Sequence, residues 1–467
     1  MNDQPKIGVV IVTWNDKKNV ISLLKSLKTL VYKNIEVHVV DNASTDDTVD
    51  VIGRKFPDVH IIKNLVNLGG TGGFNTGLKY VGKKNFKYIW LLDNDAQIMD
   101  QTLSELVKVC EADEQIGLAG CIIKDVDNKE MIVEAGGLIE RYRTGLSPFL
   151  KNQKKNTLDE VIDVDYVAVC SALVNISALK EVGLMDGRYF LFWDDMEWGL
   201  AFKKKNYRVV CSTRAVVCHP TFSERDRGDL TYYYYGIRNP FLVYALHLNA
   251  LEWFINTYFR LRSLFKNIFF NLFTGKKARA KYITRGISDF IMNRWYICKY
   301  RYSDPVRPEK LKKKVKVRKL EGKILVVCGR NYKANRLVIE QIAENCRTKI
   351  LLQPDRRQYY NLKAKTEYLD FVHNDNIPFS IKFLLLLFHG FNGVVYFDTN
   401  PYAFVGGCSY KYESDTDMLV KENAFVSYLF KIITASVLGE LISLLSMPFF
   451  IVFFVKYKYF SKENIRR

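Results

Sequence analysis

The sequence lacks the cysteine patterns of a disulfide-rich or zinc-binding scaffold. Its nine cysteines are scattered over 467 residues, and no C-x-x-C pair occurs among them. This distribution favours a reducing compartment and argues against a zinc-finger framework. Residues 1–6 also lack a signal-peptide pattern, and strand-like sequence begins at Ile7. We therefore expect the part that follows to stay in the cytosol.

The chain is also short of negative charge. It has 69 lysines and arginines against 50 acidic residues, which gives a formal net charge of +19. Such an excess suggests a polyanionic partner. No familiar nucleic-acid motif is present, and the basic residues of 259–302 and 310–319 lie near long apolar stretches. We therefore expect an anionic membrane surface as partner and no nucleic acid.

Hydrophobic strands alternate with helical patterns in the first third of the chain. Residues 20–30 have helical spacing, and residues 44–47 are typical of a helix N-terminus. The predicted strands are residues 7–12, 35–40, 59–62 and 88–92. This alternation predicts an α/β fold with a mostly parallel sheet, whose ligands bind at the carboxyl ends of the strands.

The remainder of the chain divides by composition. Its length alone predicts two or three domains. Residues 232–302 are aromatic, basic and of helical character, and residues 311–319 resemble a linker. A second small α/β pattern follows, with strands at 324–327, 350–352 and 394–397 and a helix at 333–345. The expected parts are a catalytic domain (1–231), a helical region with linker (232–320), a small α/β domain (321–425) and an apolar helix with basic tail (426–467).

Residues 432–455 are almost wholly apolar, and about 20 such residues suffice to span a bilayer. Glu440 and Pro448 interrupt the stretch, and the lysines and arginines that follow should remain cytosolic. A single span would then place the preceding domain outside the cell. We expect a peripheral or monotopic protein on the cytoplasmic face of the membrane, and a spanning helix stays the alternative.

The sequence Trp90-Leu-Leu-Asp-Asn-Asp95 ends a hydrophobic strand in two carboxylates, Asp93 and Asp95. Mg²⁺ prefers oxygen ligands and is often shared between carboxylates and substrate phosphates. An Asp-Asn-Asp sequence also occurs in ordinary turns. The pair therefore predicts a diphosphate-binding cation site only together with other features.

Residues 67–77 are rich in glycine. They do not match a dinucleotide fingerprint, because Asn75 occupies the sixth position of G-x-G-x-x-G, and no Gly-Lys-Ser/Thr follows as in a P-loop. One interpretation is that backbone amides approach a phosphate or sugar closely. The other is a tight loop that leads into a helix.

Residues 192–199 place three acids beside two tryptophans. A carboxylate with aromatic neighbours is a candidate general base, and Trp193 and Trp198 could offer apolar faces to a sugar. Acids also favour a helix N-terminus, which would put Asp194 or Asp195 at the N-cap and Glu197 in the first turn. Both interpretations can hold together.

His219 follows the apolar residues 216–218. A histidine in such a place is either structural or, downstream of an acid-x-acid pair, a third metal ligand.

Taken in order, these segments resemble the family 2 glycosyltransferases with the GT-A fold. The resemblance covers about residues 6–245 and rests on residues 12–15, 40–46, 67–77 and 93–95. Within the family, residues 69–77, residues 193–197 and His219 most resemble bacterial galactofuranosyltransferases. Rhamnosyltransferases share much of the pattern.

The resemblance implies an inverting transfer from a sugar nucleotide. Asp93, Asp95 and His219 would hold Mg²⁺ or Mn²⁺ on the diphosphate. Asp195 would deprotonate the acceptor hydroxyl, with Asp194 as the alternative base. The remaining expected site residues are Glu197 for catalysis, Trp193 and Trp198 for the acceptor, and Thr13, Trp14, Asn15, Asp41, Asn67, Gly70, Gly72, Gly73, Asn75, Asp93 and Asn94 for the donor.

The implied function is transfer of galactofuranose from UDP-galactofuranose to a lipid-linked glycan of the bacterial surface. A rhamnosyltransferase that uses dTDP-rhamnose is the nearest alternative, and a catalytically silent membrane scaffold is the alternative of another class. The second α/β unit has no acid or glycine cluster of its own. We expect it to support acceptor positioning or a homo-oligomer.

Overall fold

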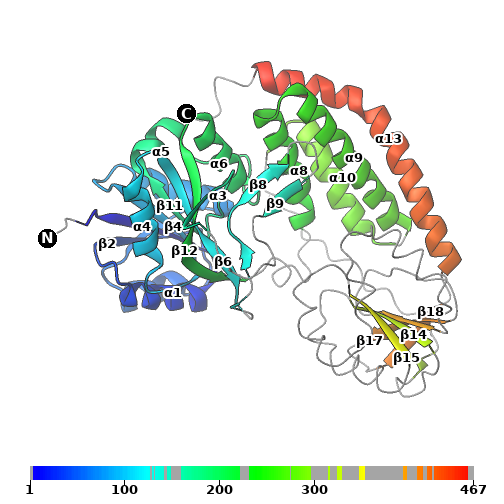
Figure 1. Cartoon of the computed structure of the whole chain (residues 1–467), viewed down its shortest axis with the longest axis horizontal. Helices are drawn as coiled ribbons and strands as arrows, with labels where there is room; N and C mark the ends of the chain where they lie inside the picture. The colour runs from blue at the N-terminus through cyan, green and yellow to red at the C-terminus, as the bar shows by residue number, and fades with distance from the viewer. Residues whose placement is uncertain are drawn as a thin grey trace. The chain divides into compact units, whose positions relative to one another are not determined.

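Figure 1 shows the chain in a computed structural model. The structure describes residues 4–126, 129–130, 132–140, 145–148, 159–220, 231–273 and 275–295, six short strands between 314 and 422, and the helix 425–460. Contacts divide the chain into two compact units. One comprises Met1–Asp304 with Leu438–Arg467, and the other comprises Pro305–Val437.

A 10-stranded sheet forms the core of the first unit. Its strands are β1 (Ile7–Thr13), β2 (Ile35–Asp41), β3 (His60–Lys63), β4 (Tyr88–Asp93), β5 (Gln97–Ile98), β6 (Ile116–Asp125), β7 (Ile132–Glu134), β10 (Val161–Asp163), β11 (Ser171–Asn175) and β12 (Arg208–His219). The order is β10-β12-β6-β11-β4-β1-β2-β3, with β5 on β12 and β7 on β6. The predicted strands at residues 7–12, 35–40, 59–62 and 88–92 are confirmed within one or two residues.

The sheet is mixed, so the expectation of a mostly parallel sheet is wrong in part. Strands β1, β2, β3 and β4 are parallel. Strand β11 runs antiparallel between β4 and β6. The position of β11 in the sheet leaves no signal in local periodicity, because the strands on either side of it are distant in sequence.

Helices cover both faces of the sheet. They are α1 (Lys17–Thr29), α2 (Thr48–Lys55), α3 (Gly69–Val81), α4 (Thr102–Ala112), α5 (Ile176–Val182) and α6 (Asp194–Lys204). Along β1, Val9 and Ile11 point into one core and Val10 and Val12 into the other. This is why β1 is a continuous apolar run rather than an alternating one.

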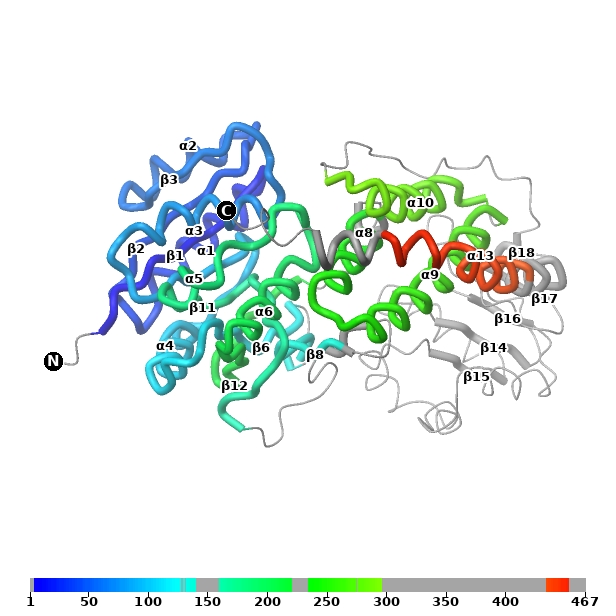
Figure 2. The backbone as a smooth tube through the Cα atoms, turned by 90° about the horizontal axis from the view of Figure 1, so that it is seen from above, coloured from blue at the N-terminus to red at the C-terminus, as the bar shows by residue number. Residues whose placement is uncertain are grey.

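The aromatic and basic region is helical, as predicted. It consists of α8 (Thr231–His247), α9 (Ala250–Phe273) and α10 (Lys277–Ile291), and Figure 2 shows these helices gathered together. Helix α13 (Phe425–Phe460) adds its second half to this bundle, where Phe450 packs on Phe241 and Phe290. Pro448 lies inside α13 without ending it.

The second unit contains a 6-stranded sheet of order β13-β18-β17-β16-β14-β15. The strands are β13 (Lys314–Val315), β14 (Lys323–Cys328), β15 (Arg347–Leu352), β16 (Gly393–Tyr396), β17 (Cys408–Glu413) and β18 (Met418–Glu422). The three predicted strands correspond to β14, β15 and β16. The helix predicted at 333–345 lies outside the described residues.

Candidate functional site

Asp93, Asp95 and His219 meet at the carboxyl end of the sheet, and we call them the cation cluster. His219 Nε2 lies 3.3 Å from Asp93 Oδ2 and 3.2 Å from Asp95 Oδ1. Candidate ligand atoms of all three lie within 4.8 Å of one another. The structure therefore brings together the three residues that the sequence predicted as metal ligands.

Strand β5 explains how the cluster forms. It follows directly after Asp95 and pairs antiparallel with the end of β12, where Ile98 faces Val217 and Gln97 faces Cys218. This pairing brings the turn that contains Asn94 beside His219, although β4 and β12 are not neighbours in the sheet.

The donor set of the cation cluster suits a hard or borderline divalent ion. Carboxylates suit Mg²⁺ and Mn²⁺, and imidazole is a common further ligand of transition ions. All three side chains are only partly buried, so solvent or a phosphate oxygen can reach an ion held there. The residues present thus fit the cation that the sequence predicted.

Asp194 and Asp195, the carboxylate pair, are the first two residues of α6. The N-cap is Trp193, so the prediction that one of the acids is the N-cap is wrong by one or two positions. Asp194 is buried and its Oδ2 accepts a 2.7 Å hydrogen bond from Thr71 Oγ1. Asp195 is half-buried and its Oδ1 accepts from the Met196 amide at 2.8 Å. Asp195 is therefore the more accessible carboxylate of the pair.

Burial raises the pKa of Asp195 well above its ordinary value, and the nearby carboxylates of Asp194 and Glu134 raise it further. Burial also raises the pKa of Asp194, against the opposing effect of the Thr71 hydrogen bond. Asp93 contributes to both shifts. The carboxylate pair and the cation cluster thus share one electrostatic neighbourhood.

Glu134 and Tyr166 belong to the same electrostatic neighbourhood, although neither residue was predicted from the sequence. Tyr166 Oη donates a 3.2 Å hydrogen bond to Glu134 Oε2. Asp195 in turn raises the pKa of Tyr166, after burial and Glu134. Neither residue stands in a recognisable pattern, because β7 is short and the contact partners are far apart in sequence.

The segment of residues 186–195, which we call the base segment, has an unusual backbone. Phe190, Phe192 and Trp193 have φ values of 64°, 65° and 68°. L-residues rarely adopt such values, and each costs of order 1–3 kcal/mol. The surrounding structure must therefore hold this conformation in place.

Helix α8 supplies that support. The Asn239 side-chain amide donates to the carbonyl oxygens of Tyr189, Leu191 and Phe192 at 3.0, 2.8 and 2.8 Å. The Arg238 guanidinium, completely buried, donates to the carbonyl oxygen of Arg188 at 2.7 Å. Neither residue was predicted from the sequence, since an Arg-Asn pair in a helix carries no signal of distant backbone partners.

The structure places two predicted site residues of α6 in its interior. Trp198 is completely buried, and its Nε1 donates to the Gly183 carbonyl oxygen at 3.0 Å, so it offers no face to a sugar. Glu197 is also buried, and its Oε1 lies 2.9 Å from His247 Nε2 on α8. Both side chains lie on the side of α6 that faces the interior. Trp193 remains half-buried, with its ring edge-on to Tyr244.

The predicted nucleotide side of the site lies at the ends of β1 and β2. Thr13 and Asp41 are register partners and both are buried. Asp41 accepts from the Ser44 amide at 3.2 Å, and Asn15 Oδ1 accepts from the Thr45 amide at 2.7 Å. These bonds tie the two strand-end loops together. Trp14 stands on this edge with 43% of its surface exposed.

The glycine-rich segment begins helix α3 at Gly69, which favours the interpretation of a loop that leads into a helix. A Cβ on Gly73 would lie 2.5 Å from Val12 Cγ1, and one on Gly72 would lie 2.4 Å from Leu68 Cβ. These two glycines allow close packing, whereas Gly70 has only ordinary contacts.

Two asparagines of the segment also have structural partners. Asn75 bonds both the oxygen and the nitrogen of the Met185 backbone, at 2.8 and 3.1 Å. Asn67 Oδ1 accepts from the Gly69 amide at 2.8 Å. Both side chains thus stabilise the backbone around the segment, and their donor-binding role stays a prediction.

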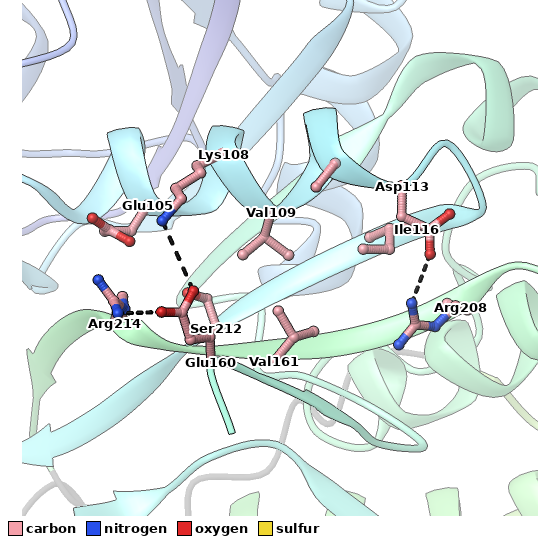
Figure 3. Close-up of a pocket in the computed structure, with 11 residues that line it drawn as sticks. Glu105, Lys108, Val109, Asp113, Ile116, Glu160, Val161, Arg208, Ser212 and Arg214 are labelled. Atoms are coloured by element: carbon pink, nitrogen blue, oxygen red, sulfur yellow. Dashed lines mark hydrogen bonds and ion pairs between the residues drawn. The ribbon is translucent and has the colours of Figure 1, made fainter. Parts of the chain in front are cut away.

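A surface hollow of about 200 Å³ lies elsewhere, between α4 and the strands β10 and β12 (Figure 3). Its charged side chains neutralise one another. Glu160 pairs with Arg214 and Lys108, and Arg208 pairs with Asp113 at 2.6 Å. The lining holds three basic and three acidic side chains, so the hollow carries no net charge.

Residues 8–182 match the family described as glycosyl transferase family 2. Relatives with three different named activities illustrate the similarity. A UDP-Glc:alpha-D-GlcNAc-diphosphoundecaprenol beta-1,3-glucosyltransferase of Escherichia coli is 31% identical over 108 residues, which are 23% of this chain and 42% of the relative. Galactofuranosyltransferase GlfT2 of Mycolicibacterium smegmatis is 23% identical, over 52% of this chain and 41% of the relative. An N-acetylglucosaminyl-diphospho-decaprenol L-rhamnosyltransferase of Mycobacterium tuberculosis is 24% identical, over 46% of this chain and 75% of the relative.

The chain thus spans about two fifths of the length of the first two relatives. Among solved structures, a mannosyltransferase from Pyrobaculum calidifontis has a TM-score of 0.42 at 16% identity, covering 63% of this chain and 89% of that one.

Proposed function

Because residues 8–182 belong to glycosyl transferase family 2, we propose that this chain transfers a hexose from a sugar nucleotide to a hydroxyl of a lipid-linked glycan. One observation carries the proposal: the cation cluster and the carboxylate pair lie close enough for Asp93 to raise the pKa of both Asp194 and Asp195. Inverting transfer uses a group that stabilises the leaving diphosphate and a base at the acceptor, and these two clusters could supply them.

Asp93, Asp95 and His219 would hold Mg²⁺ or Mn²⁺. When bound, such an ion stabilises the negative charge that develops on the departing diphosphate. Asp195 removes the proton of the acceptor hydroxyl, whose oxygen attacks the anomeric carbon as the bond to the diphosphate breaks. Attack from the face opposite the leaving group inverts the configuration at that carbon. The raised pKa of Asp195 makes it a stronger base than an ordinary aspartate.

Asp194 acts differently in this proposal. Its hydrogen bond from Thr71 joins the start of α6 to α3. It therefore positions Asp195 rather than taking the proton itself. Thr13 and Asp41 would contact the nucleotide, and the exposed ring of Trp14 is available at the same edge.

We propose UDP-galactofuranose as the donor, since the motifs around the carboxylate pair most resemble galactofuranosyltransferases and one named relative has that activity. A rhamnosyl donor is the second candidate, on the similarity to a rhamnosyltransferase. The cation cluster argues against a catalytically silent scaffold, because a scaffold does not require three converging metal-ligand side chains.

The test is a panel of sugar nucleotides offered to the purified full-length chain with Mn²⁺ and a synthetic lipid-linked acceptor, with products detected by mass. Galactofuranose transfer, absent in Asp195→Asn, is the expected result. Transfer of rhamnose alone would change the assigned donor sugar but would still support the proposed reaction. No transfer from any donor, together with no cation-dependent nucleotide binding, would favour the scaffold.

A further inference from the structure

The helical bundle has a one-sided charge. Between residues 234 and 295 the acidic residues are Glu252 and Asp289, and both are buried. The basic residues of the same stretch include several with exposed side chains: Arg262, Lys266, Lys277, Lys281 and Arg294. The bundle thus presents positive charge to its surroundings and no exposed carboxylate within residues 234–273 and 275–295.

The same bundle exposes large apolar side chains. On α9 the exposed ones are Leu251, Phe254, Phe259, Leu272 and Phe273, with 62, 42, 43, 45 and 36% of their surfaces exposed. Exposed apolar residues combined with positive charge are typical of surfaces that contact a lipid interface.

Helix α13 is attached to this bundle along one side. A Cβ on Gly439 would lie 2.7 Å from the Lys266 backbone nitrogen, so the backbones of α13 and α9 approach closely. Glu440 accepts a hydrogen bond from Tyr258 and pairs with Arg262. Further along, Met447 and Phe450 are buried in the core of the bundle.

The opposite side of α13 is apolar and exposed. Its exposed residues include Leu441, Leu444, Leu445, Phe449 and Val452, with 52, 55, 73, 67 and 67% of their surfaces exposed. By length and composition residues 434–452 could cross a membrane, with a mean hydropathy of 1.9, and only 28% of that window is buried. The attachment to α9 decides between crossing and lying flat.

A crossing α13 would either leave the bundle or carry α9 with it. Leaving would strip Glu440 of its partners and expose the core around Phe450. Carrying α9 along would bring Arg262 and Lys266 into hydrocarbon, where each charge costs at least about 2.5 kcal/mol. Both routes are unfavourable.

We infer that α8–α10 together with residues 438–452 of α13 form a docking surface for an anionic lipid bilayer, with α13 lying in the plane of the interface. The apolar side chains enter the boundary between headgroups and acyl chains, and the lysines and arginines contact anionic headgroups. This inference does not depend on the proposed reaction, because binding to vesicles needs no donor or acceptor.

Vesicle flotation tests this docking surface. The vesicles consist of phosphatidylcholine, either alone or with about 30% of the anionic lipid phosphatidylserine. The full chain is expected to float with the anionic vesicles and more weakly with the neutral ones. The double variant Leu445→Gln/Phe449→Gln should have a partition coefficient between vesicles and water that is at least about tenfold lower. Lys266→Gln/Lys277→Gln should lower it about fivefold for each charge removed.

Two control variants make the same kinds of replacement outside the proposed docking surface. Leu65→Gln removes a leucine that is 98% exposed, and Lys25→Gln removes an exposed lysine of α1. Both should float as the wild type does, and the circular dichroism of all variants should match it. Wild-type flotation of both double variants, or equal losses in the controls, would overturn the inference.

The in-plane orientation has its own readout. An epitope placed after Arg467 should be digested by protease added to sealed inside-out membrane vesicles, in which the cytosolic face is exposed. Protection of that epitope until detergent is added would show that α13 crosses the bilayer and would overturn the in-plane arrangement.

Discussion

The two halves of the candidate site are built in opposite ways. The cation cluster forms at strand ends, where the β5–β12 pairing brings Asp95 beside His219. The base segment contains three residues of positive φ within four positions, and it is held by hydrogen bonds from α8, some 50 residues further along the chain. The first half follows from the sheet itself, and the second depends on a helix outside it.

This difference explains why the helical bundle belongs to the same compact unit as the sheet. Asn239 fixes the carbonyl groups that precede the carboxylate pair, and His247 holds Glu197 one turn into α6. A change in α8 should therefore affect the base without disturbing the cation, and a change in the cluster should do the reverse. The following variants test that separation.

The largest effect is expected at the cation cluster. Asp93→Ala or Asp95→Ala removes a negatively charged oxygen ligand and should abolish cation-dependent transfer. EDTA should do the same to the wild type, as measured by product formation from the labelled donor. Asp100→Ala, in the loop that follows β5, is the matched control and should stay active. Full turnover in EDTA would contradict the assignment of the cluster.

The next effect concerns the base. Asp195→Asn keeps the shape but cannot accept the proton, and single-turnover transfer should fall by about 10²–10⁴-fold. The variant should also unfold at a higher temperature at neutral pH. The pKa of Asp195 is raised in the folded state, so its stabilising contribution is present below the unfolded pKa and is lost as pH rises through the folded pKa. If Asp194→Asn is inactive and Asp195→Asn active, the two residues have exchanged roles.

A smaller effect is expected in α8. Asn239→Ala removes the hydrogen bonds to the Leu191 and Phe192 carbonyl groups, while the Tyr189 carbonyl keeps a 3.2 Å bond from Arg238. The segment can then relax and shift Asp195. A displacement of about 1 Å can cost about 10²-fold in rate, and we expect kcat to fall about 10–100-fold with little change in cation-dependent nucleotide binding. Asn256→Ala, a buried asparagine of α9 that bonds within its own helix, should lower stability but keep kcat. Equal losses of kcat in both variants would show a general effect on folding.

The smallest effect is a shift of the pH profile. Asp195 acts as a base only when ionised, so transfer should rise with pH through its raised pKa and then level off. The Glu134 carboxylate helps to raise that pKa. Glu134→Gln should therefore move the rising limb to lower pH while the plateau stays nearly constant. An unchanged profile would mean that Glu134 does not act on the group that titrates.

Local pattern was enough to predict part of this site. Asp93, Asp95 and His219 follow hydrophobic strands directly, and strand ends are readable from periodicity. The sequence could not show which side of α6 faces the core, and so it did not reveal that Trp198 is completely buried. It also could not reveal the antiparallel β11, Glu134 or Asn239, whose partners lie far away in the chain. Long-range pairing decides these features, and one sequence carries no local trace of it.

The central claim is that one half of the site holds the diphosphate through a cation and the other half takes the proton. Calorimetric titration of UDP in the presence of Mn²⁺ tests it most directly, on Asp95→Ala and Asp195→Asn in parallel. The account predicts that Asp95→Ala loses the Mn²⁺-dependent part of UDP binding, whereas Asp195→Asn binds as the wild type does and yet does not transfer. Undiminished Mn²⁺-dependent binding by Asp95→Ala would contradict it.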